Sequence, residues 1–340
     1  MTIHSQLKTT ANFFVLLLIT ALISQLAIAS EDDKRGLNWT GPSVTADTPF
    51  QMGDFRAVII GNNHYKEGGV WKNLNTAVND AKTVASLLQS EYGFQDVTLL
   101  KNAGRKEILG AFKDLSNRVE PNDNVLVYYA GHGHLEDDER RGYWIPSDGE
   151  DYDDTTFIRN STVRDEINII AEKTKHTLLI SDSCFSGSLL RGGNRGPSQI
   201  ELSQGYYTKV GNKRSVQVFA AGGNEYVDDN YRNSGHSPFT YFLVNELRNN
   251  TQKYISLSEL ATNIIKAVAN NVDQTPEAGV LAGAGDELGE FIFARVSLKD
   301  NLVEVFAGRD NLTSLGKDED AQTTEAKTNQ TSTFLPAFRF

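Results

Sequence analysis

Short apolar runs alternate along the chain with longer segments whose apolar residues recur every three or four positions. The short runs have no polar face, which is typical of strands buried on both sides of a sheet. We predict strands at 56–61, 97–100, 124–129, 178–181, 216–220 and 291–293, and a short strand or hairpin at 142–146. We predict helices at 77–92, 106–119, 162–174, 238–247 and 256–272. The alternation predicts an α/β fold with a parallel sheet that helices cover on both faces.

The pattern changes towards the two ends of the chain. Residues 9–30 carry no charge and contain a strongly apolar run that ends in small residues, which is typical of a secretory signal peptide. The alternative is an uncleaved membrane anchor. We therefore expect export to the periplasm or the medium, with no stable membrane span after signal cleavage. The predicted order is signal peptide 1–29, linker 30–53, folded domain 54–296 and a polar, disordered tail 297–340.

Charge and cysteine content narrow the classes of function. The formal net charge is −11, which argues against nucleic acid as a partner. Cys184 is the sole cysteine, so the chain forms no intramolecular disulfide. Its thiol is therefore an intermolecular partner, a buried apolar group or a reactive nucleophile. A bare thiol is a liability in an oxidising compartment, and export gives more weight to the reactive alternative.

Two loops carry residues that suit nucleophilic catalysis. His132 lies between glycines after the predicted strand 124–129, and Cys184 follows the strand at 178–181, 52 residues later. If the two strands are parallel neighbours, both loops lie at the carboxyl edge of the sheet, where open α/β sheets bind ligands. An imidazole can take the proton of a thiol, and the N–H groups of Gly133 and Cys184 could form an oxyanion hole. Either residue alone could be structural, but the pair predicts a catalytic dyad.

The sequences around these residues resemble a known family. Tyr-Tyr-Ala-Gly-His-Gly (128–133) and Asp-Ser-Cys-Phe-Ser-Gly (182–187) are similar to the His and Cys boxes of caspase-like cysteine peptidases, the metacaspase branch in particular. The resemblance covers roughly residues 55–295. It implies the caspase–haemoglobinase fold, with a mostly parallel six-stranded sheet, and a cysteine-type endopeptidase with His132 as base and Cys184 as nucleophile. Three positions depart from the usual pattern of the family: Ala130, His134 and Phe185.

The resemblance also implies a substrate preference. Asp182 and Asp80 match two acidic positions that, in metacaspases, line the pocket for the residue before the cut bond. Two carboxylates in one cleft would select Arg or Lys through charge-assisted hydrogen bonds. The alternatives are a turn carboxylate at Asp182 and a solvated helix residue at Asp80.

Two further segments bear on metal binding and processing. The acidic run 148–154 is predicted to be a solvated loop, and we expect no cofactor; the alternative is Ca²⁺, which some metacaspases bind near this part of the chain. Residues 190–214 are predicted to form a long Gly-rich loop. It contains basic residues, so an enzyme that cuts after Arg or Lys could cut itself there. These residues are Arg191, Arg195, Lys209, Lys213 and Arg214.

Two other functions stay open at this point. One is a legumain- or gingipain-like peptidase of different specificity, which shares the His-Gly and Cys loops. The other is a non-catalytic binding protein that has kept the caspase fold. The presence of both His132 and Cys184 argues against the second alternative.

Overall fold

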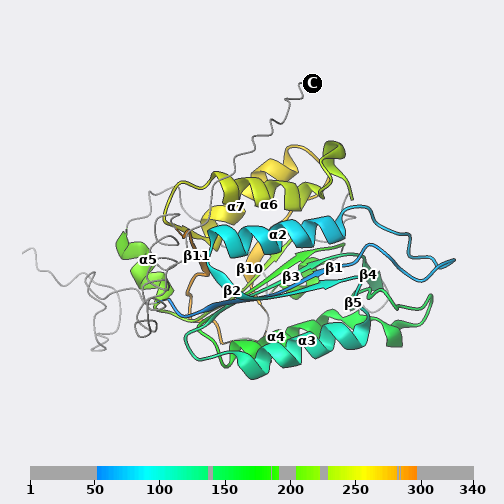
Figure 1. Cartoon of the computed structure of the whole chain (residues 1–340), viewed down its shortest axis with the longest axis horizontal. Coiled ribbons are helices and arrows are strands. Elements are labelled where there is room, and N and C mark those ends of the chain that lie inside the picture. The colour runs from blue at the N-terminus through cyan, green and yellow to red at the C-terminus, as the bar shows by residue number, and fades with distance from the viewer. Residues whose placement is uncertain are drawn as a thin grey trace, which may run out of the picture. The chain divides into compact units, whose positions relative to one another are not determined.

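A six-stranded sheet forms the centre of the molecule (Figure 1). The computed structural model describes residues 52–136, 141–184, 186–190, 204–222, 229–281, 283 and 285–296. The strands lie in the order β10-β8-β7-β3-β1-β2; five are parallel, and β10 runs antiparallel to β8. Their bounds are β1 Phe55–Gly61, β2 Phe94–Lys101, β3 Asn124–Ala130, β7 His176–Asp182, β8 Ser215–Ala220 and β10 Glu277–Val280.

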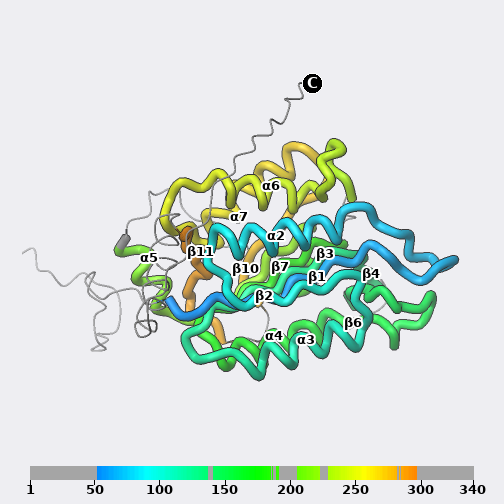
Figure 2. The backbone as a smooth tube through the Cα atoms, viewed as in Figure 1, coloured from blue at the N-terminus to red at the C-terminus, as the bar shows by residue number. Residues whose placement is uncertain are grey.

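Helices cover both faces of this sheet, as the sequence predicts. Figures 1 and 2 show α2, α6 and α7 on one side and α3 and α4 on the other. Alternate residues of β1 enter the two cores: Ala57 and Ile59 pack beneath the first group, Val58 and Ile60 beneath the second. Burying each large apolar side chain is worth about 1.5–3 kcal/mol, so a strand that is apolar on both faces stabilises both layers. The helix bounds are α2 Ala77–Glu91, α3 Arg105–Arg118, α4 Asn160–Ala171, α6 Pro238–Asn249 and α7 Leu257–Ala269.

Local sequence signals set the starts of α6 and α7. The Ser256 side chain accepts a hydrogen bond from the Glu259 N–H, and the Glu259 carboxylate accepts one from the Ser256 N–H, which is a capping box. At α6 the Ser237 side chain accepts from the Thr240 N–H, and Pro238 occupies the first turn. Ser237 also lines a cavity at the carboxyl edge of the sheet.

Two predictions about the elements are wrong. Residues 291–293 do not join the central sheet; among the described strands, β11 (Ile292–Ala294) pairs with β9 (Tyr254–Ser256) alone. The sixth strand is β10, whose four residues Glu-Ala-Gly-Val at the sheet edge are too short and too weakly apolar to give a strand pattern. The predicted loop 190–214 contains a helix, α5 (Gln204–Gly211), which has glycines in its sequence and little amphipathic periodicity.

Smaller elements surround the sheet. A three-stranded sheet of β4 (Gly133–Glu136), β5 (Arg141–Trp144) and β6 (Ile158–Arg159) follows the His132 loop directly. Single 3₁₀ turns are η1 Asp154–Thr156, η2 Ser186–Leu189 and η3 Tyr231–Asn233.

The predicted signal peptide 1–29, almost all of the linker 30–53 and the tail 297–340 lie outside the described residues, and those assignments stay predictions. Among the helices that the structure describes, none combines the length and apolar character needed to cross a bilayer.

Candidate active site

The two loops predicted to carry chemistry leave neighbouring strands. β3 and β7 are parallel partners, and their last residues, Ala130 and Asp182, lie opposite one another. The N–H of Gly131 donates to the carbonyl oxygen of Asp182 at 3.4 Å, so the chains stay together where the strands end. His132 and Cys184 each follow this point by two residues, at the carboxyl edge of the sheet.

A cavity of about 260 Å³ opens at this edge. It is lined by all five residues that were predicted from the sequence to act in catalysis or substrate binding: Asp80, His132, Gly133, Asp182 and Cys184. The remaining wall comes mainly from the segment before α2, including Trp71 and Lys72, and from Asp229 and Ser237.

Gly133 lies in contact with the Cys184 backbone. A Cβ atom at position 133 would lie 2.1 Å from the carbonyl oxygen of Cys184, a distance that real contacts do not reach. Glycine is therefore required at position 133 because the two loops touch here.

Two tyrosine hydroxyls hold the backbone of His132. Its N–H donates to the Tyr65 hydroxyl at 2.8 Å, and its carbonyl accepts from the Tyr129 hydroxyl at 2.9 Å. The Tyr65 ring lies against the imidazole, with 4.7 Å between the ring centroids. These contacts fix the loop that carries the imidazole.

The imidazole of His132 has a defined tautomer. Its Nε2 lies 2.7 Å from the carbonyl oxygen of Lys72, and a carbonyl can only accept, so Nε2 carries a hydrogen. Burial lowers the pKa of His132, although the Lys72 carbonyl opposes this effect. The ring is therefore neutral around pH 7, and Nδ1 keeps the lone pair that can accept a proton.

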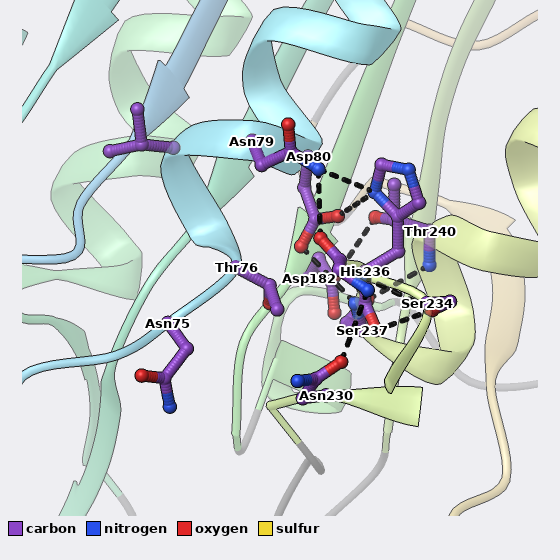
Figure 3. A network of polar contacts seen from close by, with 12 residues as sticks. Asn75, Thr76, Asn79, Asp80, Asp182, Asn230, Ser234, His236, Ser237 and Thr240 are labelled. Carbon is purple, nitrogen blue, oxygen red and sulfur yellow. Dashed lines mark hydrogen bonds and ion pairs between the residues drawn. The ribbon is translucent and has the colours of Figure 1, made fainter. Parts of the chain in front are cut away.

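Asp182 is a buried carboxyl with one oxygen bound and one oxygen unbound. Oδ2 accepts hydrogen bonds from the hydroxyls of Ser237 at 2.5 Å and Thr240 at 2.6 Å (Figure 3). Oδ1 has no hydrogen-bond partner among the described residues, although the side chain is only 4% exposed. Burial, together with the negative charge of Asp80, raises the pKa of Asp182 to about 7.

Asp80, on the first turn of α2, lies beside it. Oδ1 is 2.6 Å from Nδ1 of His236, and Oδ2 accepts from the Ser237 N–H at 3.3 Å (Figure 3). Burial raises the pKa of Asp80, and the hydrogen bond from His236 opposes this. The two carboxylates thus meet in one cavity but have different partners.

Comparison with known proteins shows the family of the chain. The model of the family described as caspase domain matches residues 54–280. The chain belongs to the caspase domain family.

Relatives of this caspase domain are similar over part of their length. Metacaspase-1A of Aspergillus terreus is 29% identical over 157 residues, which cover 41% of this chain and 37% of that protein. Metacaspase-4 of Arabidopsis thaliana is 28% identical over 155 residues, which cover 40% of this chain and 34% of that protein. Caspase-1 from Spodoptera frugiperda has a solved structure that covers 69% of this chain and 92% of its own at 17% identity and a TM-score of 0.49. The matched segment thus spans little more than a third of each metacaspase.

Sequence reasoning missed several residues of the caspase domain site. The Lys72 carbonyl is a backbone group, which no side-chain motif could indicate. His236 and Asp229 approach from loops that are distant in sequence; Asp229 accepts from the Asn75 N–H at 2.7 Å and so ties the start of α2 to the cavity wall. His236 lies two residues before Pro238, the first residue of α6. The sequence signal for the start of this helix was the only indication of where His236 lies in the fold.

The acidic run 148–154 is more than a solvated loop. Asp151 accepts from the Val70 N–H with both carboxylate oxygens at 2.9 Å, and Glu150 pairs with Lys66 at 2.8 Å. The carboxylates of Glu150 and Asp151 therefore bind the segment 66–72, whose Lys72 carbonyl contacts His132. Within the described residues, no group of three or more His, Cys, Asp and Glu side chains could hold a metal ion.

Proposed function

We propose that this caspase domain is a cysteine endopeptidase in which Cys184 is the nucleophile and His132 the base. The observation that carries the proposal is the shared cavity: both residues line it, and the Lys72 carbonyl holds the imidazole with Nδ1 as the proton acceptor. A neutral imidazole is what general-base activation of a thiol requires.

The reaction then follows from the roles of the two side chains. His132 Nδ1 takes the thiol proton as Cys184 Sγ attacks the carbonyl carbon of the scissile bond. The tetrahedral adduct collapses to a thioester when His132 gives that proton to the leaving amine. Water, deprotonated by His132, attacks the thioester, and the proton returns to sulfur as the acid leaves. Thiol and imidazole supply every group of these steps, so we infer that the chemistry needs no cofactor; a role for Ca²⁺ would show as lost activity in EDTA.

The N–H groups of Gly133 and Cys184 are the proposed oxyanion hole. The Ile145 N–H donates to the His132 carbonyl, so the next pair in the ladder, Gly133 and Trp144, is at a non-hydrogen-bonded position. This register supports a Gly133 N–H directed away from β5. Such a donor is typically worth about 3 kcal/mol of transition-state stabilisation.

We propose that the enzyme cuts after Arg or Lys. The supporting feature is Oδ1 of Asp182, a residue of the cavity wall, because this oxygen has no hydrogen-bond partner in the part of the chain that the structure describes. A buried carboxylate oxygen without a donor is costly, and a guanidinium or ammonium group would supply one. Asp80 adds negative charge in the same cavity.

Self-processing is proposed at Arg191 or Arg195, which lie outside the described residues. Lys209 lies within α5, and Arg214 is partly buried with its N–H bound to Glu287. A peptidase needs an extended, accessible segment, so we expect Lys209 and Arg214 to be poor cleavage sites. Mass spectrometry of wild type and Cys184→Ala after expression tests this. Cuts in the wild type alone support it; an intact wild type that cleaves peptides would contradict it.

We also propose export, with signal cleavage after Ala29 and a mature protein in the periplasm or medium. The N-terminal residue of the exported protein, determined by mass spectrometry, tests this. A chain that keeps residues 1–29 would support the anchor instead.

Cleavage of matched peptide reporters tests the proposed activity. The reporters differ only in the residue before the scissile bond: Arg, Lys, Asp, Asn or citrulline, the neutral isostere of Arg. Wild type should cut the Arg and Lys reporters, Cys184→Ala should cut none, and Asp182→Asn should lose mainly Arg and Lys cleavage. Circular dichroism and urea unfolding confirm that the variants fold. Turnover by Cys184→Ala, or equal cleavage after Asp, would refute the proposal.

A further inference from the structure

The segment just before α6 contacts both carboxylates of the cavity. Ser237 donates its backbone N–H to Asp80 and its hydroxyl to Asp182. Thr240, in the first turn of α6, adds a second hydroxyl to Asp182. Figure 3 shows these groups gathered between α2 and the start of α6.

The two carboxylates differ in the chemistry of their partners. Asp182 receives neutral hydroxyl donors alone at Oδ2. Asp80 is 1% exposed and receives a backbone N–H and the ring of His236, which is itself 16% exposed. Two donors, one on each oxygen, match an ionised carboxylate, so the hydrogen between His236 and Asp80 belongs on Nδ1.

Removing the imidazole would leave Asp80, in a buried place, with only neutral donors among the described residues, the Ser237 N–H and the Thr76 side chain. A buried carboxyl that loses its strong donor takes up a proton, because ionisation there is no longer compensated. Above about pH 7, where Asp182 is ionised as well, the cavity would then lose one of its two negative charges without any change at His132 or Cys184.

We propose that His236 is a positioning residue for substrate specificity, which keeps the Asp80 carboxylate ionised and fixed so that the cavity discriminates a cationic side chain from a neutral one of the same shape. The inference rests on the proposed preference for Arg and Lys. His236 does not touch the reacting atoms and acts through Asp80.

Binding to an inactive full-length chain tests the proposal without relying on turnover. In the Cys184→Ala background, fluorescence anisotropy measures the affinity of a labelled peptide with one Arg and of its citrulline counterpart. The parent should prefer the Arg peptide. With His236→Ala added, the preference should fall by about tenfold, the usual effect of losing a hydrogen bond to a charged group, while citrulline affinity stays constant.

Two further variants separate positioning from general damage. His236→Asn places an amide N–H near the position of Nδ1 and should restore most of the preference. His64→Ala removes an exposed histidine outside the cavity and should match the parent.

Three results would overturn the inference. They are an unchanged preference in His236→Ala, a parallel loss of affinity for both peptides, or a failure of His236→Asn to recover the preference. A parent that binds both peptides equally would instead refute the basic specificity itself, and this inference with it.

Discussion

At the scale of single residues, the proposed role of Asp182 in binding Arg or Lys predicts a dependence of specificity on pH. Burial and the charge of Asp80 raise its pKa to about 7, so the carboxyl is neutral below that pH and negative above it. The ratio of kcat/KM for Arg over citrulline reporters should therefore rise as pH increases through about 7. His132 affects both reporters alike and cancels in the ratio. A ratio that is high and flat from pH 5 to pH 9 would contradict this.

Asp182→Asn is the matched control for that prediction. It keeps the side-chain shape and removes the titrating group, so its ratio should be low at every pH. A ratio that still rises near pH 7 would assign the titration to another group.

The buried imidazole of His176 leads to a second prediction, which concerns the pH dependence of stability. Its Nε2 donates to the Gly211 carbonyl at 2.9 Å, and its Nδ1 accepts from the Ser215 hydroxyl at 2.8 Å. An imidazole that donates at one nitrogen and accepts at the other is neutral. Burial lowers the pKa of His176 to about 4, whereas an unfolded histidine titrates near 6.5. The unfolded chain thus binds the proton more readily, and this stabilisation is complete above about pH 6.5 and is lost as pH falls towards 4.

Urea unfolding at pH 7.5 and 4.5 measures this loss. His176 alone should lower the free energy of unfolding by about 3 kcal/mol over that range. The His176→Gln variant has no titrating side chain at this position, so its free energy of unfolding should fall less between pH 7.5 and 4.5. At pH 7.5 this variant should be less stable than the wild type. Equal pH dependence in both proteins would show that His176 is not responsible.

Part of the candidate site could be predicted from residue types and short motifs in the sequence. His132 and Cys184 stand out because each follows an apolar strand, and the parallel pairing of β3 with β7 brings the two loops together. The tautomer of His132 could not be predicted, because it depends on a backbone carbonyl at Lys72, 60 residues away. The His236 contact depends equally on long-range packing.

At the scale of elements, the close contact between the His132 and Cys184 loops predicts that Gly133 does not tolerate a side chain. Gly133→Ala would place its Cβ 2.1 Å from the Cys184 carbonyl oxygen, so the loops must separate. We expect a loss of activity of 100-fold or more, since one misplaced oxyanion donor costs about that much. The unfolding free energy should also fall.

Gly110→Ala is the control for this change. Gly110 lies within α3, and a Cβ there meets nothing within 4 Å. Alanine in a helix interior is favoured over glycine by about 0.5–1 kcal/mol, so this variant should be slightly more stable and fully active. Full activity in Gly133→Ala would show that the loops do not need this close contact.

Periodicity predicted the buried elements well and the marginal ones poorly. β1, β3, β7 and β8 are buried on both faces and rich in apolar residues, so tertiary packing and local pattern agree. β10 has only four residues and is fixed by pairing with β8, a contact its own sequence does not encode. α5 likewise lacks a pattern that distinguishes it from a polar loop.

At the scale of the whole molecule, the sheet brings together groups that are distant in sequence. The cavity takes its walls from the segment before α2, from the ends of β3 and β7, and from the turn before α6. His132, Cys184 and the two carboxylates of Asp80 and Asp182 are therefore neighbours only in the folded chain. The proposed catalysis depends most on one pair among these groups, because His132 must activate Cys184.

The pH dependence of Cys184 alkylation by iodoacetamide, in wild type and His132→Ala, tests that activation most directly, because it needs no substrate. If His132 takes the thiol proton, the wild-type rate should rise over the pH range in which imidazole becomes neutral, below pH 7. His132→Ala should react only as ordinary thiols ionise, around pH 8.5. Superimposable profiles for the two proteins, or a wild-type thiol that stays inert while the protein is folded, would contradict the account.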